Sequence, residues 1–569
     1  MIISIKNKII LNLAMIFSLL FCYSKQITNH FTQLFGDNYD TIIETSILQH
    51  WYNVLFCHEK WNLAQYFYPY QKTLGYNDGY FLFGMIYAPI FAILKDPFLA
   101  NEITGIFLHV IGFYSFYILS KYTFKFSYSS SIFGSFIFVI SNNIFMQAAH
   151  HMQILVIYFL PTLCIILNKI KLYISQNNNM KFLLYCLYFS LLYAACLLTG
   201  FYISWFFTFF IAIFLVVFVI ISYKSDNFQY IKDYFSKNIK KIIFFIFTNI
   251  IFLLPFLSVY LEKATETGMH HWSDSHHFSP HIYDIFNIGS FNIYPILLHY
   301  CLDILHNCMN NKNHISNMNY VYSEFSSGFP PITLLISFLG IINKIRLLEN
   351  KEKIFYQSFF VANIIVFILP LRLGIISPWH LVYSIVPGAK GLRVVVRFFL
   401  FETFPICIGL ACFYDMLEKT KKRYFFLFLS FLIIIEQVNY SPVYNLSRNS
   451  SLNIQKSIPK KPETCKVFFV IDKPFDEKIT SSDISKNTYD LYHANVFAMF
   501  YSELHNTPTI AGFSTFNPPD WNFASPYQDA VPLKPIIERA LQYAHKHQIT
   551  DSSLCYIDLR VNKWVKLKE

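Results

Sequence analysis

Phe-Gly-Asp-Asn-Tyr-Asp at residues 35–40 opens a polar segment that extends to Pro89 and best indicates the architecture of the chain. The segment continues with an amphipathic run to Cys57, then Tyr-Phe-Tyr-Pro at 66–69 and Leu-Gly-Tyr-Asn-Asp-Gly-Tyr at 74–80. It follows the first apolar segment and carries most of the acidic residues suited to chemistry. Nearly everything after it has the apolar character of a membrane scaffold.

The composition is typical of a polytopic membrane protein. The 569 residues are 54% hydrophobic and 14% charged, whereas soluble domains are about 25% charged. The net charge of +11 comes from Lys and Arg in short runs between apolar segments, as the positive-inside rule produces. We therefore expect no nucleic-acid partner, although a soluble protein this basic would suggest one.

Twelve apolar segments are candidate membrane spans, and the charges that flank them predict the topology. They lie at 9–24, 81–94, 102–120, 130–147, 154–168, 182–199, 204–222, 242–260, 328–343, 354–371, 398–414 and 424–438. Segment 81–94 is shorter than the ~20 residues that a span needs, and Pro89 interrupts it. If segment 81–94 spans the membrane, the basic clusters at 169–181 and 419–423 lie on the outer side. If the segment lies flat on the membrane surface, every basic loop lies on the inner side. We expect about eleven spans, with the N-terminus inside and the tail outside.

This topology places all candidate reactive groups on the outer face. The outer stretches are 25–101, the turn at 150–151, 261–327, 372–397 and the tail 441–569. The inner loops are short and basic. We therefore expect a transmembrane domain at 1–440, with 25–101 as its first extracytoplasmic loop and 261–327 as its second large outer loop, followed by an extracytoplasmic domain at 441–569.

The tail has the alternation of a small α/β domain. Residues 466–472 and 553–560 are predicted strands, and residues 491–504 and 535–545 are predicted helices. Cys465 and Cys555 both lie in this tail, and they could pair in an oxidising compartment. The sequence leaves that pairing open.

Three acidic residues in the first loop are spaced for one face of a helix: Asp37, Asp40 and Glu44. We expect the opposite, apolar face to rest on the bilayer surface. That face comprises Ile43, Ile47, Leu48, Trp51 and Leu55. A carboxylate placed there can take a proton from an acceptor hydroxyl. The alternative for Asp37 and Asp40 is helix capping.

Three further positions on the outer face have two interpretations each. Asp78 lies in Gly-Tyr-Asn-Asp-Gly at 75–79, which suits a turn or cap, or a carboxylate that binds a sugar or a divalent ion. His150 and His151 follow Gln147 at the outer end of a span. They are either structural or hydrogen-bond a phosphate or a sugar that they line.

Arginines near the outer surface are candidates for binding a phosphate. Arg393 and Arg397 share a helical face as the chain enters the span at 398–414, and Arg372 is near in sequence. Two guanidiniums can hold a phosphate bidentately, or they can snorkel to lipid headgroups. The histidines of the second outer loop match no diagnostic metal-ligand spacing. Two interpretations remain: they bind a metal, or they belong to a solvent-exposed loop near a substrate cleft. These histidines are His270, His271, His276, His277 and His281.

The order of these features resembles the GT-C superfamily of membrane glycosyltransferases, in particular a bacterial branch that is poorly characterised. The matching stretches are 35–40, 48–53, 67–69, 74–78, 141–143, 150–153, 386–393, 397–398, 498–499, 508–514 and 518–521. The Asp-Glu and Lys-Pro-Pro motifs of the superfamily are absent from the first loop. The resemblance implies a helical GT-C fold with interfacial helices in the first outer loop. It also implies the bacterial cytoplasmic membrane and a polyprenyl-phosphate-linked sugar donor.

The resemblance assigns the catalytic acid of the first loop to Asp37, with Asp40 second, and the phosphate-binding charges to Arg393 and Arg397. The resulting hypothesis is an inverting glycosyltransferase in which Asp37 is the base and Asp78 positions the sugar or a divalent cation. Glu44, with the two histidines of the turn, would line the substrate. Two alternatives remain: a transporter or flippase of a lipid-linked saccharide, and a non-catalytic envelope-assembly protein. Membrane lipids are expected partners, and the acceptor is open.

Overall fold

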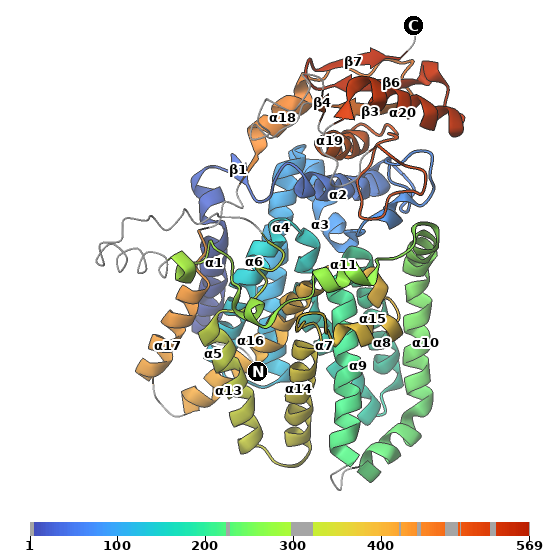
Figure 1. Ribbon diagram of the computed structural model, residues 1–569. Helices are drawn as coiled ribbons and strands as arrows, with labels where there is room; N and C mark the ends of the chain where they lie inside the picture. Colours follow the sequence, from blue (N-terminus) through green and yellow to red (C-terminus); the bar gives the residue numbers. More distant parts are fainter. Residues whose placement is uncertain are drawn as a thin grey trace.

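The computed structural model describes residues 5–223, 228–296, 323–419, 423–440, 445–472, 488–489, 491–523 and 531–567. A bundle of upright helices carries a small domain of strands and helices at one end (Figure 1). The first outer loop lies between the two, so it is covered by the tail on one side and by the bundle on the other. The predicted fold class, mainly α with a small C-terminal α/β region, is confirmed.

Eight helical segments of the described residues are long and apolar enough to cross a membrane, which makes this a multi-pass membrane protein. Each segment consists of one helix or of two consecutive helices. These are α1 (Ile5–Thr28), α4 (Pro97–Ile118) with η2 (Leu119–Thr123), α5 (Tyr128–Ile140) with α6 (Asn142–Ala148), η3 (Met152–Phe159) with α7 (Leu160–Ser175), α8 (Asn179–Thr199), α9 (Phe201–Tyr223), α10 (Phe228–Thr267), and η6 (Val395–Arg397) with α16 (Phe398–Lys419).

Three more predicted spans are helices, although they are not among these eight. They are α13 (Pro331–Leu347), α14 (Asn350–Ile368) and α17 (Arg423–Glu436). Segment 81–94 forms α3 (Phe81–Leu94), which packs against α2 (Asp40–Phe56) and α4. The count of about eleven spans and the flat orientation of α3 stay predictions. Residues 297–322 of the outer loop 261–327 and residues 420–422 of the basic cluster lie outside the described ranges.

The centre of the apolar face of α2 is buried in protein, so the prediction that this part rests on the bilayer was wrong, whereas Leu55 at the end of the face is 45% exposed. Ile47 and Leu48 are fully buried and Trp51 is 2% exposed, because α3 and α19 (Leu491–Leu504) pack against this helix. The Trp51 ring lies where a side chain on Gly84 would stand, since a Cβ there would come within 2.3 Å of it. Only a glycine permits this close approach between α2 and α3.

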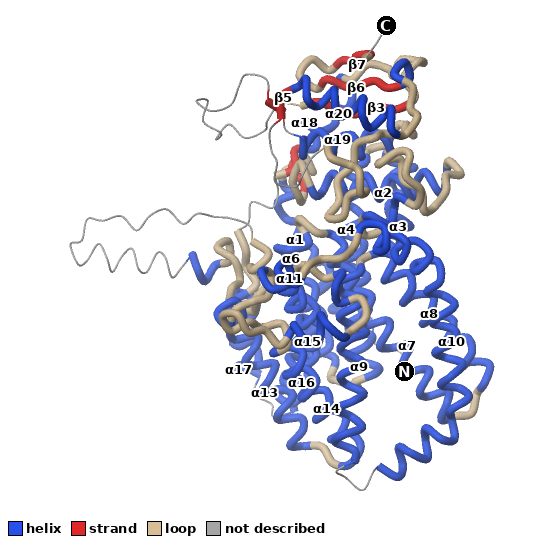
Figure 2. The backbone as a smooth tube through the Cα atoms, turned by 45° about the vertical axis from the view of Figure 1, so that its right-hand side comes forward, coloured by secondary structure: helices blue, strands red, loops and turns tan. Residues whose placement is uncertain are grey.

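The tail forms the predicted α/β domain. Its sheet has the order β3-β6-β7, with β3 (Val467–Ile471) parallel to β6 (Leu554–Asp558) and β6 antiparallel to β7 (Lys563–Lys566). The chain crosses from β3 to β6 through α19 and α20 (Leu533–Lys546), as a parallel pair requires. The four predicted elements are confirmed, and Figure 2 shows the strands gathered at this end of the molecule. Cys465 and Cys555 form a disulfide.

The tail is joined to the first outer loop through the main chain. β1 (Gln33–Leu34) pairs with β2 (Leu446–Ser447), which precedes α18 (Arg448–Ser457). The Phe67 amide donates to the Ala511 carbonyl at 3.0 Å. A second short ladder, β4 (Thr488–Tyr489) with β5 (Val531–Pro532), lies within the tail. Loop residues also contribute to the hydrophobic core of the tail: Ala64, Tyr66, Phe67 and Tyr76. The loop and the tail therefore form one layer, whereas the predicted domain boundary at 440/441 is untested.

Breaking the disulfide should destabilise this layer. The bridge closes a loop with a sequence separation of 90 residues, so we expect Cys465→Ser to lower the free energy of unfolding of the tail by about 2–5 kcal/mol. Limited proteolysis of the purified protein, with the tail and the bundle followed separately, measures this. Cys57→Ser is the matched control because Cys57 is an exposed free cysteine. Equal tail protection in both variants would contradict the prediction.

Candidate active site

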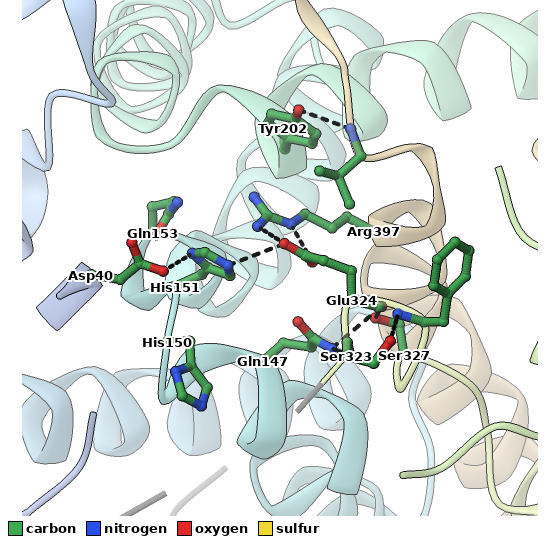
Figure 3. Close-up of polar contacts among 12 residues, drawn as sticks. Asp40, Gln147, His150, His151, Gln153, Tyr202, Ser323, Glu324, Ser327 and Arg397 are labelled. Carbon is green, nitrogen blue, oxygen red and sulfur yellow. Dashed lines mark hydrogen bonds and ion pairs between the residues drawn. The ribbon is translucent and has the colours of Figure 1, made fainter. Parts of the chain in front are cut away.

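Four segments that are far apart in sequence bring polar side chains together where the bundle meets the tail. Figure 3 shows how His151, in the turn after α6, lies between Asp40 and Glu324, and how Glu324 meets Arg397, which precedes α16. The members are Asp37, Asp40, His150, His151, Glu324 and Arg397. We call these six residues the polar cluster. The predicted residues Asp37, Asp40, His150, His151 and Arg397 thus lie together in the structure.

Asp37 forms an ion pair with His150 at one end of the polar cluster. Its Oδ2 lies 3.0 Å from His150 Nδ1, and its Oδ1 accepts the Tyr39 amide at 2.9 Å. Burial raises the pKa of Asp37, but the hydrogen bond and charge of His150 and the backbone amides outweigh it, so the pKa lies below its usual value. Asp37 is therefore an ionised carboxylate at neutral pH, and its orientation is fixed from two sides.

The rest of the polar cluster is a chain in which acidic and basic side chains alternate. His151 Nδ1 lies 3.9 Å from Asp40 Oδ2, and its Nε2 lies 3.2 Å from Glu324 Oε1. Arg397 binds the same carboxylate bidentately, with Nη2 2.5 Å from Oε1 and Nε 3.0 Å from Oε2. Burial raises the pKa of Glu324, but Arg397 and His151 hold it far below its usual range. The chain therefore connects the first loop to the arginine.

Asp40 is where the tail reaches the polar cluster. The Tyr492 hydroxyl of α19 donates to Asp40 Oδ1 at 3.2 Å, and the Tyr492 ring packs on Tyr39 with centroids 4.7 Å apart. Burial raises the pKa of Asp40, and the charge of Asp37 adds to this, against the opposing effect of His151. The N-cap of α2 is Tyr39, with no side-chain cap bond, so neither aspartate caps the helix through its side chain. Asp40 lies in the first turn, where the dipole favours it.

Glu44 is a buried residue of α2 that hydrogen-bonds to the chain just after the histidine turn. Its Oε1 accepts the Met152 amide at 2.7 Å and the Tyr80 hydroxyl at 3.1 Å. Burial raises its pKa well above the usual value. Glu44 also lines a small internal cavity of about 70 Å³, together with Thr41 and Glu102. Its predicted role as a substrate-lining residue stays a prediction.

Asp78 binds the first helical amide of α9. Its Oδ1 accepts the Phe201 N–H at 2.9 Å, and this contact supports the interpretation of Asp78 as a capping residue. Burial raises the pKa of Asp78, and that bond and the charges of Arg397 and His151 partly offset the rise. Asp78 is thus within electrostatic reach of the polar cluster. Its predicted sugar-binding or metal-binding role is untested.

The other two predicted arginines lie outside the polar cluster. The Arg393 guanidinium lies 5.4 Å from the centre of the Phe278 ring, and the Arg393 amide donates to the Tyr202 hydroxyl at 2.8 Å. Arg372 donates from Nε to His281 Nε2 at 2.9 Å and from Nη1 to the His276 carbonyl at 3.1 Å. Arg372 therefore holds the histidine-rich loop in place. Phosphate binding by either arginine stays a prediction.

The described residues contain no group of three or more His, Cys, Asp or Glu side chains that could hold a metal ion. This applies to the histidine-rich loop as well as to the polar cluster. The His270 ring packs at a tilt against Phe516 with centroids 4.3 Å apart, and burial followed by the charge of Arg393 lowers the pKa of His270 to about 4. The donor set does not fit the divalent cation considered for Asp78, so no step below involves one.

Sequence reasoning missed Glu324, Tyr492 and Tyr202. Glu324 is an outer-face acid a few residues before Pro330 and Pro331 at a span entrance, and this placement was the available signal. Tyr492 and Tyr202 carried no signal, because their partners lie in other segments. The Arg397 guanidinium lies 5.3 Å from the centre of the Tyr202 ring.

Comparisons with known proteins give likenesses to solved structures but no match by sequence. No family model matches the sequence, and no curated protein matches it. Among solved structures, the chain is similar to the apo form of an oligosaccharyltransferase from Archaeoglobus fulgidus, with a TM-score of 0.48 and 11% sequence identity. The alignment covers 96% of this chain and 69% of that one.

Proposed function

We propose that the protein is a GT-C type membrane glycosyltransferase that moves a sugar from a polyprenyl-phosphate donor to an acceptor on the extracytoplasmic face. The observation that supports this most is the polar cluster itself. It places an ionised carboxylate, Asp37, in the same loop as Asp40. From Asp40, contacts of 3.9 Å or less lead through His151 and Glu324 to the guanidinium of Arg397. An inverting transfer needs these two kinds of group, a base for the acceptor and a cation for the leaving phosphate.

Asp37 is the proposed base. In the displacement, an acceptor hydroxyl attacks the anomeric carbon, the bond from that carbon to the phosphate oxygen breaks, and the hydroxyl proton passes to the base. The low pKa keeps Asp37 ionised before the reaction, and its side chain is 26% exposed, so an acceptor can approach. His150 and the Tyr39 amide hold the carboxylate in one orientation.

Arg397 and Arg393 are the proposed phosphate ligands. A guanidinium can bind two phosphate oxygens in parallel, which stabilises the charge that develops on the leaving group. Arg397 is 7% exposed, so water screens its charge little. Arg393 is half-buried on the same entry to α16.

The proposed location is the bacterial cytoplasmic membrane, with the tail outside. The disulfide between Cys465 and Cys555 supports this, because disulfides persist in oxidising compartments. Asp40 of the polar cluster contacts Tyr492 of the tail, so the cluster would face the same side as the tail, which lies at one end of the bundle (Figure 1). A lipid-linked donor held in the outer leaflet would then reach the polar cluster without leaving the membrane.

The test is a transfer assay with purified protein in detergent. A panel of radiolabelled polyprenyl-phosphate sugars is offered, and donor binding and slow release of the sugar to water are measured. We expect one donor to bind and to be hydrolysed. A heat-inactivated sample and a panel of nucleotide sugars serve as controls. Binding of no lipid-linked donor would favour transport or assembly and would withdraw the catalytic assignments.

A further inference from the structure

We propose that the Glu324 carboxylate fills an anion subsite, built by Arg397 and His151, that a phosphate ester occupies in its place. The subsite itself is argued from contacts within the protein. The identity of its natural ligand, the phosphate of the lipid-linked donor, rests on the proposed function. The inference adds His151 as a phosphate ligand and Glu324 as an internal competitor for the same donors.

The donors around Glu324 are the set that a phosphate needs. Both oxygens of the carboxylate face the fork of Arg397, at 2.5 and 3.0 Å, and one of them also faces His151 Nε2 at 3.2 Å. Figure 3 shows these groups converging on the carboxylate from two sides. Paired guanidinium and imidazole donors bind carboxylates and phosphates in the same way, because both ligands present coplanar oxygen pairs.

Contacts that do not involve Glu324 hold the donor groups of the subsite, Arg397 and His151, in position. The Arg397 guanidinium rests over the Tyr202 ring, whose hydroxyl accepts the amides of Arg393 and Val394 at 2.8 and 3.2 Å. The ring is therefore fixed to the backbone that leads into Arg397. His151 is held on its other side by Asp40. Removing the glutamate carboxylate would thus leave the donors in position.

The backbone that carries Glu324 is anchored, so an exchange requires only its side chain to turn. The Ser323 carbonyl accepts Gln147 Nε2 at 3.0 Å, and the Ser327 carbonyl accepts Asn143 Nδ2 at 3.2 Å. Gly328 packs so closely on its neighbours that a Cβ there would come within 2.5 Å of the Asp284 carbonyl. A glutamate side chain has enough rotatable bonds to leave Arg397 while this segment stays in place.

The test compares phosphate binding by the full-length protein and by Glu324→Gln. The amide keeps the shape but carries no charge and only one acceptor oxygen for Arg397 and His151, so we expect a short-chain prenyl phosphate to bind on the order of tenfold more tightly. Glu262→Gln is the matched control, because Glu262 pairs with Lys72 on the exposed surface of α10. Arg397→Lys in the Glu324→Gln background should abolish the gain. Unchanged or weaker binding by a folded Glu324→Gln protein would overturn the proposal.

A second variant covers the case in which the amide fails to fold. Glu324→Asp keeps the charge but shortens the reach to Arg397, so a smaller gain in affinity is expected, and no gain would overturn the proposal. Inorganic phosphate and phosphatidylglycerol are tested beside the prenyl phosphate. A gain shared by all three identifies a general phosphate site, and a gain confined to the prenyl phosphate identifies a lipid-linked ligand.

The two proposals can fail separately. If no donor sugar is transferred but Glu324→Gln still gains affinity for phosphate, the subsite stands and the proposed function falls. If transfer occurs but the variant gains nothing, the subsite falls and the proposed function stands.

Discussion

Replacing Asp37 with Asn will lower the rate of sugar transfer by about 10²–10⁴-fold while donor binding stays close to that of the wild type. The amide oxygen can still accept the Tyr39 amide, so the turn before α2 is preserved. The amide cannot take a proton from the acceptor, and it removes the charge that faces His150. The loss should therefore appear in the rate at saturating donor rather than in the donor affinity. Radiolabelled sugar transfer measures both.

Two further variants make this result specific. Asp233→Asn is the matched control, since Asp233 is exposed on α10 and contacts Gln229. Its transfer rate should equal that of the wild type. Asp40→Asn distinguishes the two first-loop acids, because burial keeps the pKa of Asp40 above its usual value. Full activity in Asp37→Asn with loss in Asp40→Asn would move the base to Asp40.

Truncating Glu503 will weaken the contact between the tail and the first loop and cost about 3–5 kcal/mol of stability. Glu503 is fully buried and accepts the Gln65 amide at 2.7 Å and Asn53 Nδ2 at 3.1 Å. Its Oε2 lies 3.6 Å from Nδ1 of His50, which is 1% exposed. Glu503→Ala leaves these donors buried without their acceptor. Thermal unfolding and hydrogen exchange of α2 and α19 report the loss.

The same pair predicts a dependence of stability on pH. Burial lowers the pKa of His50, but the charge and hydrogen bond of Glu503 outweigh it, so the folded pKa lies above the usual value. The pair's contribution is therefore complete below the unfolded pKa of about 6.5 and is lost as the pH rises through the folded pKa. Glu503→Gln should remove this dependence. A melting temperature of the wild type that is constant across this range would contradict the assignment.

Local pattern predicted the elements well, because their signals lie within single segments. β3 and β6 are runs of five buried residues, and α19 begins and ends where its apolar pattern does. The face of α2 was misassigned for a related reason. An apolar helix face indicates burial but does not identify the partner, and here α3 and α19 take the place of lipid. The identity of that partner is a property of the tertiary fold.

The candidate site was predicted in its members but not in its pairings. The sequence pointed to Asp37 and Arg397, which are far apart along the chain. The residue that connects Arg397 to His151 is Glu324, which the sequence did not indicate. The contact from His151 to Glu324 spans a sequence separation of 173 residues, and the contact from Asp40 to Tyr492 spans 452. No helical or strand periodicity encodes contacts at these separations.

The pairing of β1 with β2, and of the loop at Gln65 with Thr509, has a consequence for how the protein is made. A ribosome delivers the first loop long before the tail that covers it, so the bundle is complete while α2 still lacks α19. Asp40 and Tyr39 therefore gain their contacts with Tyr492 only after the last segment has been made. Under the proposed function, activity would then depend on completion of the tail rather than on membrane insertion alone, and a chain truncated before Leu491 would insert but be inactive.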